Sequence, residues 1–103
     1  MHTIEWAAGL FEGEGCLNDS RRKYPALNLS MCDKDVVNNF AEVVGYGKVH
    51  KMERPSPRKT IYRWEVNKRS EVRRILDLLL PHLGLRRAYK ALNILDDLEL
   101  ATN

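Results

Sequence analysis

The most constraining feature of this 103-residue sequence is its apolar segment Trp6–Gly15, which ends in two carboxylates among glycines. A helix here would carry apolar or small residues on both faces: Ile4, Ala7, Ala8 and Phe11 on one, and Trp6, Gly9, Leu10 and Gly13 on the other. A helix that is apolar all round is buried on both sides, and this segment is far shorter than the ~20 residues that span a bilayer. The pattern therefore predicts a helix between two packed surfaces.

Two glycines indicate what the second surface is. Gly9 and Gly13 are one helical turn apart on the same stripe, so the backbone of a neighbouring helix can approach closely. We expect that neighbour to be the same helix of a second copy. The protein would then be a homodimer whose interface contains Trp6, Gly9, Leu10 and Gly13.

The two acids at the end of this helix predict a cation site. Glu12 and Glu14 stand where the helix dipole already contributes roughly half a negative charge. Two such helix ends meeting at a two-fold axis would need a counterion between their carboxylates. Mg²⁺ suits this position, because it takes one or two carboxylates and fills its other positions with water and phosphate oxygens. The predicted substrate group is a phosphodiester.

A resemblance to a known family agrees with this prediction. Residues 7–15 read Ala-Ala-Gly-Leu-Phe-Glu-Gly-Glu-Gly and resemble the LAGLIDADG motif, with acids at its sixth and eighth places. The segments that follow are also similar in order to those of the LAGLIDADG homing endonucleases. The resemblance implies an α+β fold of order αββαββαα, with a four-stranded antiparallel sheet that forms a saddle for DNA. The motif occurs once, and family members with one motif work as homodimers.

The implied function is a metal-dependent endonuclease encoded by an intron or mobile element. Such an enzyme makes a double-strand break in a long, near-palindromic DNA site by hydrolysing phosphodiesters. We expect residues 1–103 to form one domain, since this length supports a single core.

The expected strands and helices were assigned from periodicity and from turn residues. Strands are expected at 16–22, 26–31, 48–54 and 60–66, with helices from Asp33 to a stop at Gly45, from a cap at Ser70 to a break at Pro81 and Gly84, and over 86–100. The second hairpin turns at Pro55-Ser56-Pro57. One face of the sheet must be covered by helices, which leaves the other face open.

Charge distribution supports DNA as the partner of that open face. The net charge is only +3, but Lys and Arg concentrate between residues 48 and 63, with a second group at 21–23. Alternation, together with the basic second hairpin, predicts DNA contacts from Asn18, Ser20, Arg22, Tyr24, Asn28, Ser30, Lys48, His50, Lys51, Arg54, Arg58, Lys59 and Arg63. Met52, Ile61 and Glu65 share the outward positions. We interpret His50 as a DNA or solvent contact, because no second His or Cys stands at metal-ligand spacing.

The family motif also suggests roles for individual residues. By resemblance, Glu14 binds the metal, Mg²⁺ or in its place Mn²⁺ or Ca²⁺, with the Gly13 carbonyl as a second contact. Glu12 either joins the ion or serves the helix end. Asp33 stands where relatives often have a glutamine that orders water, and is alternatively an N-cap. Arg86 matches a basic residue near the phosphates, and is alternatively a solvated helix start.

The remaining expectations concern the cell and the competing functions. Cys16 and Cys32 make no disulfide framework, so they are expected as free thiols with packing roles. No segment is long enough for a membrane helix, and the start lacks a signal-peptide pattern. We expect an intracellular protein, in the cytoplasm or nucleoid of a prokaryotic or phage-infected cell or in an organelle. The alternatives are a non-catalytic DNA- or RNA-binding relative, such as a regulator or splicing maturase, and a plain dimeric interaction domain.

Overall fold

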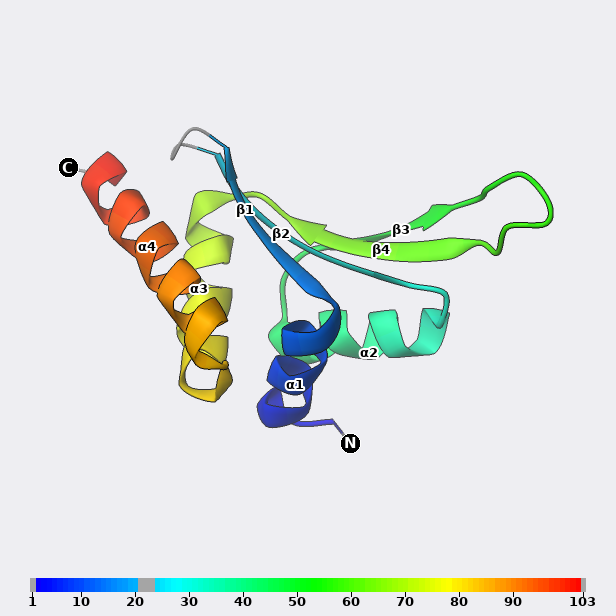
Figure 1. Ribbon diagram of the computed structural model, residues 1–103, viewed down its shortest axis with the longest axis horizontal. Helices are drawn as coiled ribbons and strands as arrows, with labels where there is room; N and C mark the ends of the chain where they lie inside the picture. Colours follow the sequence, from blue (N-terminus) through cyan, green and yellow to red (C-terminus); the bar gives the residue numbers. More distant parts are fainter. Residues whose placement is uncertain (1, 21–23, 103) are drawn as a thin grey trace.

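The structure has the α+β element order that the sequence predicts. In the computed structural model, residues 2–20 and 24–102 are described, except for the side chains of residues 20 and 100–102. The order is αββαββαα with one short 3₁₀ turn added before the last helix (Figure 1). The elements are α1 (Ile4–Glu14), β1 (Gly15–Ser20), β2 (Tyr24–Met31), α2 (Lys34–Val44), β3 (Lys48–Met52), β4 (Ile61–Val66), α3 (Arg69–Leu79), η1 (Leu80–His82) and α4 (Leu85–Thr102).

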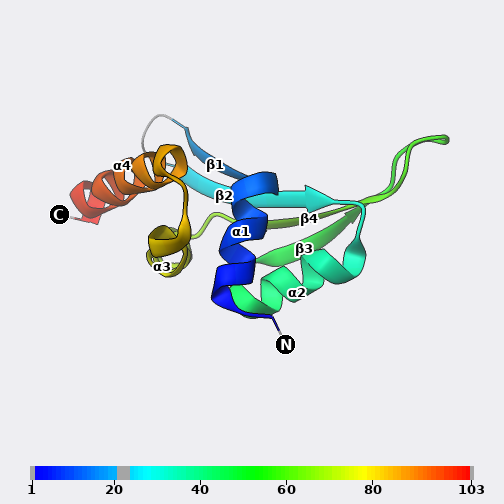
Figure 2. The same cartoon turned by 60° about the horizontal axis from the view of Figure 1, so that its bottom comes forward.

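The four strands form one antiparallel sheet in the order β1-β2-β4-β3. Helices α1, α2 and α3 pack against one face of this sheet, and α4 lies beside β1 and α3 (Figures 1 and 2). Leucines and a tryptophan that alternate along the central strands β2 and β4 point to the helices and are fully buried: Leu27, Leu29 and Trp64. The opposite face carries the alternate positions and has no described helix over it. This is the open face that the alternation predicts.

Three aromatic rings form the centre of the core. Phe40 and Trp64 meet edge to face with their centroids 4.8 Å apart, and Phe11 lies within 6.5 Å of both. The Trp64 indole N–H donates to the Tyr46 carbonyl at 2.8 Å, so burial leaves no polar atom of this ring unpaired. Gly47 has a φ of +92°, and a Cβ there would collide with the indole. The ring cluster joins α1, α2 and the sheet.

The ends of several elements differ from the predicted ones. Helix α1 begins at Ile4 because Thr3 accepts a hydrogen bond from the Trp6 N–H at 3.1 Å. The predicted cap at Ser70 is wrong: α3 begins at Arg69, and Lys68 is its N-cap residue. The stop of α2 at Gly45 is confirmed, with a φ of +80° that glycine adopts without strain.

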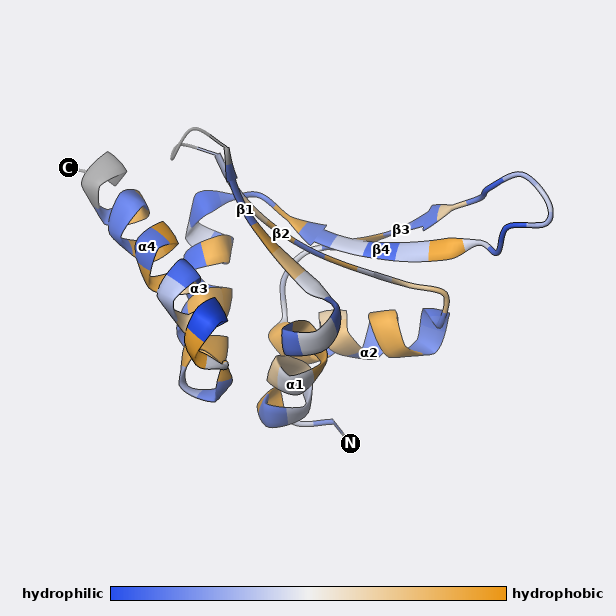
Figure 3. Cartoon of the chain, in the orientation of Figure 1, coloured by the Kyte–Doolittle hydropathy of each residue, from blue (hydrophilic) through white to orange (hydrophobic). Residues whose placement is uncertain are grey.

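The second hairpin has shorter strands than predicted. Strand β3 ends at Met52, so Arg54 lies in the connection, where its Nε donates to the Lys59 carbonyl at 2.7 Å. The connection extends well beyond the helices (Figure 1) and is hydrophilic over most of its length (Figure 3). It therefore presents backbone and basic side chains to solvent.

The cysteine prediction is confirmed in one part and wrong in the other. Cys16 and Cys32 are free thiols. Both are exposed, so neither has the packing role expected of it.

We predict that Trp64→Ala lowers the free energy of unfolding by about 3–5 kcal/mol, because it empties the centre of the core. Urea denaturation followed by far-UV circular dichroism measures this loss. Tyr24→Ala is the control, since Tyr24 is 65% exposed and should change stability by less than about 0.5 kcal/mol. Similar losses in the two variants would contradict the described core.

Candidate active site

Helix α1 is covered on one side only by the described chain. Ala7, Ala8 and Phe11 are fully buried in the core. Gly9 and Gly13 are exposed, and a Cβ added to either would have no atom within 4 Å. Trp6 and Leu10, the other members of the predicted interface, are partly buried. The stripe of Trp6, Gly9, Leu10 and Gly13 is thus an open apolar surface in one protomer, and its pairing with a second copy stays a prediction.

Glu12 is engaged in holding α1 to α4. Its carboxylate accepts a hydrogen bond from the Gly84 N–H, immediately before the first turn of α4, and lies 3.0 Å from Arg87 Nε. The same Nε donates to the Glu12 carbonyl at 2.9 Å, and the guanidinium sits 5.7 Å from the centre of the Phe11 ring. The carboxylate lies at the positive N-terminal end of α4, and the guanidinium lies at the negative C-terminal end of α1. Each charge is therefore stabilised by the local helix dipole. Of the two roles predicted for Glu12, the structure supports the one in which its carboxylate stabilises the helix ends.

Glu14 has a different environment from Glu12. It is the last residue of α1 and is exposed, and none of the described hydrogen bonds or ion pairs involves its carboxylate. At the end of the helix, the Gly15 N–H donates to the Phe11 carbonyl and Arg87 Nε donates to the Glu12 carbonyl. The Gly13 carbonyl is the next one along the chain. Gly15 itself is buried against the Phe11 ring, where a Cβ would collide. This close contact turns the chain sharply from α1 into β1 and leaves Glu14 at the bend.

A basic hollow lies beside this bend. It has a volume of about 300 Å³ and is lined by Gly15, Cys16, Leu17, Arg86, Arg87 and Lys90. The fold thus brings Arg86, predicted from the motif, next to the residues that follow Glu14. Sequence reasoning missed Arg87 and Lys90. The spacing of Arg86 and Lys90, one helical turn apart, was the available signal for Lys90.

Asp33 stands at the N-cap position of α2, directly after β2. Its side chain makes no capping hydrogen bond, and it is exposed. The carboxylate therefore does not cap the N-terminus of α2, and its predicted role near the phosphate stays open.

The open face of the sheet carries most of the predicted DNA contacts. The residues on it are Asn18, Tyr24, Asn28, Ser30, Lys48, His50 and Arg63, each next to an inward neighbour on its strand. Arg22 and the side chain of Ser20 lie outside the described residues. Cys16 also belongs to this face, opposite Asn28, and was not predicted there.

The basic residues of the second hairpin are placed differently. Lys51 pairs in register with Tyr62 on the helix side of the sheet, and its ammonium lies 3.1 Å from the Glu53 carboxylate. The hydrogen bond and charge of Glu53 raise the pKa of Lys51. Arg54, Arg58 and Lys59 are exposed in the connection beyond the strands. These four residues do not share the central face with Arg63 and Lys48.

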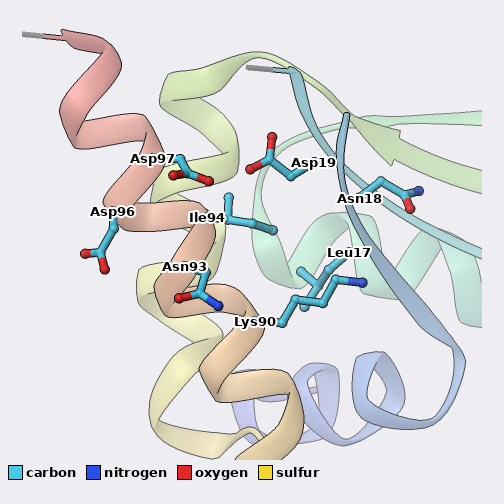
Figure 4. Close-up of a pocket in the computed structure, with 8 residues that line it drawn as sticks. All are labelled: Leu17, Asn18, Asp19, Lys90, Asn93, Ile94, Asp96 and Asp97. Carbon is cyan, nitrogen blue, oxygen red and sulfur yellow. The ribbon is translucent and has the colours of Figure 1, made fainter. Parts of the chain in front are cut away.

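A larger cavity of about 550 Å³ lies between β1 and α4 (Figure 4). Its polar lining combines Asn18 and Asp19 of β1 with Lys90, Asn93, Asp96 and Asp97 of α4, and Lys90 extends toward β1. Neither Glu14 nor Arg86 lines it, but Leu17 and Lys90 line both this cavity and the basic hollow, so the two adjoin.

No group of three or more His, Cys, Asp and Glu side chains gathers within residues 2–20 and 24–102 in a way that would hold a metal. Among the described helices, none has both the length and the apolar character needed to cross a membrane.

Comparison with solved structures identifies the fold. No protein-family model matches the sequence, and no curated protein matches it. The homing endonuclease I-CvuI, solved with its DNA target in the presence of calcium, superposes with a TM-score of 0.77 at 20% identity over 97% of this chain and 68% of its own. I-TnaI, also a homing endonuclease, gives 0.72 at 18% identity over 96% and 73%. The LAGLIDADG meganuclease I-CpaMI, bound to uncleaved DNA, gives 0.76 at 13% identity over 100% and 38%. This chain has the fold of the LAGLIDADG homing endonucleases, as its motif at residues 7–15 implies.

We predict that Glu12 and Glu14 contribute differently to stability. Glu12→Ala removes the partner of Gly84 and Arg87, and should lower the free energy of unfolding by about 1–3 kcal/mol. Glu14→Ala removes an exposed side chain and should change it by less than about 0.5 kcal/mol. Urea denaturation of both variants measures the difference, and equal losses would refute the structural role of Glu12.

Proposed function

We propose that the protein is a homodimeric, metal-dependent endonuclease that makes a double-strand break in a long, near-palindromic DNA site. The observation that carries this proposal is the exposed Glu14 carboxylate at the bend between α1 and β1, beside the basic hollow of Arg86. An acid with no partner among the described residues, next to cations that attract phosphate, is the arrangement that phosphodiester hydrolysis uses. The relatives I-CvuI and I-CpaMI, solved as DNA complexes, support the same activity.

The donor atoms at this bend fit a magnesium ion. Glu14 would provide a carboxylate oxygen and Gly13 a backbone carbonyl oxygen, both hard ligands of the kind that Mg²⁺, Mn²⁺ and Ca²⁺ accept. Such an ion, when bound, activates water and offsets charge on the leaving oxygen. Glu12 is already engaged by Gly84 and Arg87, so it contributes by holding the helix end in place.

The protein side chains supply binding and orientation. Arg86 would neutralise charge that develops on the scissile phosphate, since a guanidinium stays protonated and can donate two parallel hydrogen bonds. Lys90, in the same hollow, would hold the DNA backbone on either side of the scissile phosphate. Asp33, free of any capping bond, would order solvent near the phosphate. The open face of the sheet would lie in the major groove and select the sequence.

Two copies are needed to cut both strands at one site. Each protomer offers a single Glu14, and its uncovered stripe on α1 ends at Gly13, next to that residue. Pairing through Gly9 and Gly13 would place the two Glu14 carboxylates near the two-fold axis. One active acid per strand then follows from the symmetry.

The catalytic proposal predicts that Glu14→Gln abolishes cleavage and keeps DNA binding. A plasmid library with randomised inserts, incubated with Mg²⁺, reports cutting, and we expect a loss of about 100-fold or more. The affinity for a duplex containing a site selected by cleavage, measured by gel shift, should change far less, because Glu14 contributes little of the binding surface. Glu42→Gln, an exposed acid on α2, is the matched control. Undiminished cutting by Glu14→Gln would remove its metal role, and binding without cutting by the wild type would assign the non-catalytic alternative.

The dimer proposal predicts that Gly9→Leu separates the protomers. The protomer has room for this side chain, so the variant should fold, yet the two helices would be held apart. Light scattering should show the dimer dissociating at concentrations about 10-fold or more above the wild-type midpoint. Asn38→Leu adds the same side chain to the exposed side of α2 and should leave the dimer intact. An undisturbed Gly9→Leu dimer would contradict pairing through α1.

A further inference from the structure

One acid stands on the open face of the sheet, where a DNA surface is expected to be basic. Among the described residues of this face, Glu65 is the single carboxylate, and it stands next to the last residue of β4. It faces Asn28 across β2 and Lys48 across β3 in the register of the sheet. A carboxylate held toward a polyanion costs binding energy unless its charge is compensated. Its position therefore calls for a specific partner.

Glu65 has a partner on each of its two oxygens. Oε1 lies 3.0 Å from Nε2 of His50, on the neighbouring strand β3. Oε2 lies 3.4 Å from Nε of Arg63, two positions earlier on β4 and on the same face. Arg63 and His50 are opposite each other in the β3–β4 register. The three side chains thus form one cluster across the two strands.

This cluster orients the guanidinium of Arg63. Its Nε is buried and makes no hydrogen bond within the described residues, so the Glu65 carboxylate, 3.4 Å away, holds it as an ion pair, whereas the side chain as a whole is 38% exposed. With Nε turned to Glu65, the Nη groups are the donors left for a ligand. Because the carboxylate already restricts one edge of the arginine, the side chain loses less conformational freedom when its other edge binds a ligand. Arginine in the major groove recognises guanine by donating to its O6 and N7 atoms.

We propose that Glu65 is a specificity-determining residue that holds Arg63 to read a guanine at one base pair of each half-site. The inference rests on the proposed function, because it assumes that the open face lies in the major groove. Glu65 acts through Arg63 and contacts no base itself. His50 contacts the second carboxylate oxygen, so the acid is held from both sides, and the Arg63 guanidinium compensates its charge toward the DNA.

The test is selection of binding sites from a random duplex DNA library in Ca²⁺, with the wild type, Glu65→Gln, Arg63→Met and the double variant. We expect the wild type to prefer guanine at one position of each half-site. Arg63→Met and Glu65→Gln should each lower that preference by about 10-fold, at the same base pair. The double variant should lose no more than either single one, because the two residues act as a unit.

The controls separate this effect from loss of charge or of fold. Glu53→Gln makes the same chemical change at an exposed acid outside the sheet face, and should leave base preferences unaltered. Thermal melts should show all variants folded, since the substituted side chains are partly exposed and lie outside the core.

Three outcomes would overturn the inference. An unchanged preference profile for Glu65→Gln would remove its role in specificity. A change at a base pair other than the one lost in Arg63→Met would mean that Glu65 contacts DNA directly. If the wild type enriches no sequence at all, the proposed function itself is contradicted, and this inference with it.

Discussion

The structure depends on how helix α1 is anchored. Its inner side, through Phe11, joins the ring cluster that connects the sheet to α2, and its end is tied to α4 by Glu12 and Arg87. Because these contacts use one side of the helix and the first of the two acids at its C-terminal end, the other side and the second of these acids remain open. The same short segment thus provides core, candidate interface and candidate metal ligand.

Most of the fold could be predicted because its signals are local. Alternation in residues 26–31 and 61–66 defines which side chains enter the core, and Gly45 ends α2 where a left-handed residue is needed. The start of α3 was missed because a capping hydrogen bond contributes only about 1 kcal/mol. Burial of Val72, Ile75, Leu76 and Leu79 contributes more and sets the helix without a side-chain cap.

The candidate site was predictable only in part, since its contacts are distant in sequence. The motif identifies Glu12 and Glu14 equally, and nothing near them shows that Gly84 and Arg87 engage only the first. Arg86 and Arg87 are adjacent and alike in the sequence, and both line the hollow, yet Arg86 is exposed while Arg87 is mostly buried and lies over the Phe11 ring. The cluster of Glu65, Arg63 and His50 could not be predicted, because it depends on which residues of β3 and β4 lie opposite each other. This register cannot be read from the sequence alone.

The proposed function depends on two copies meeting through α1 and placing their Glu14 carboxylates together at the DNA. A crystal structure of the protein with a selected duplex in Ca²⁺ tests it most directly. We expect two protomers related by a two-fold axis through α1, with each Glu14 on a cation that also contacts a backbone phosphate. A single protomer on the duplex, or Glu14 directed to bulk solvent in the bound dimer, would contradict it.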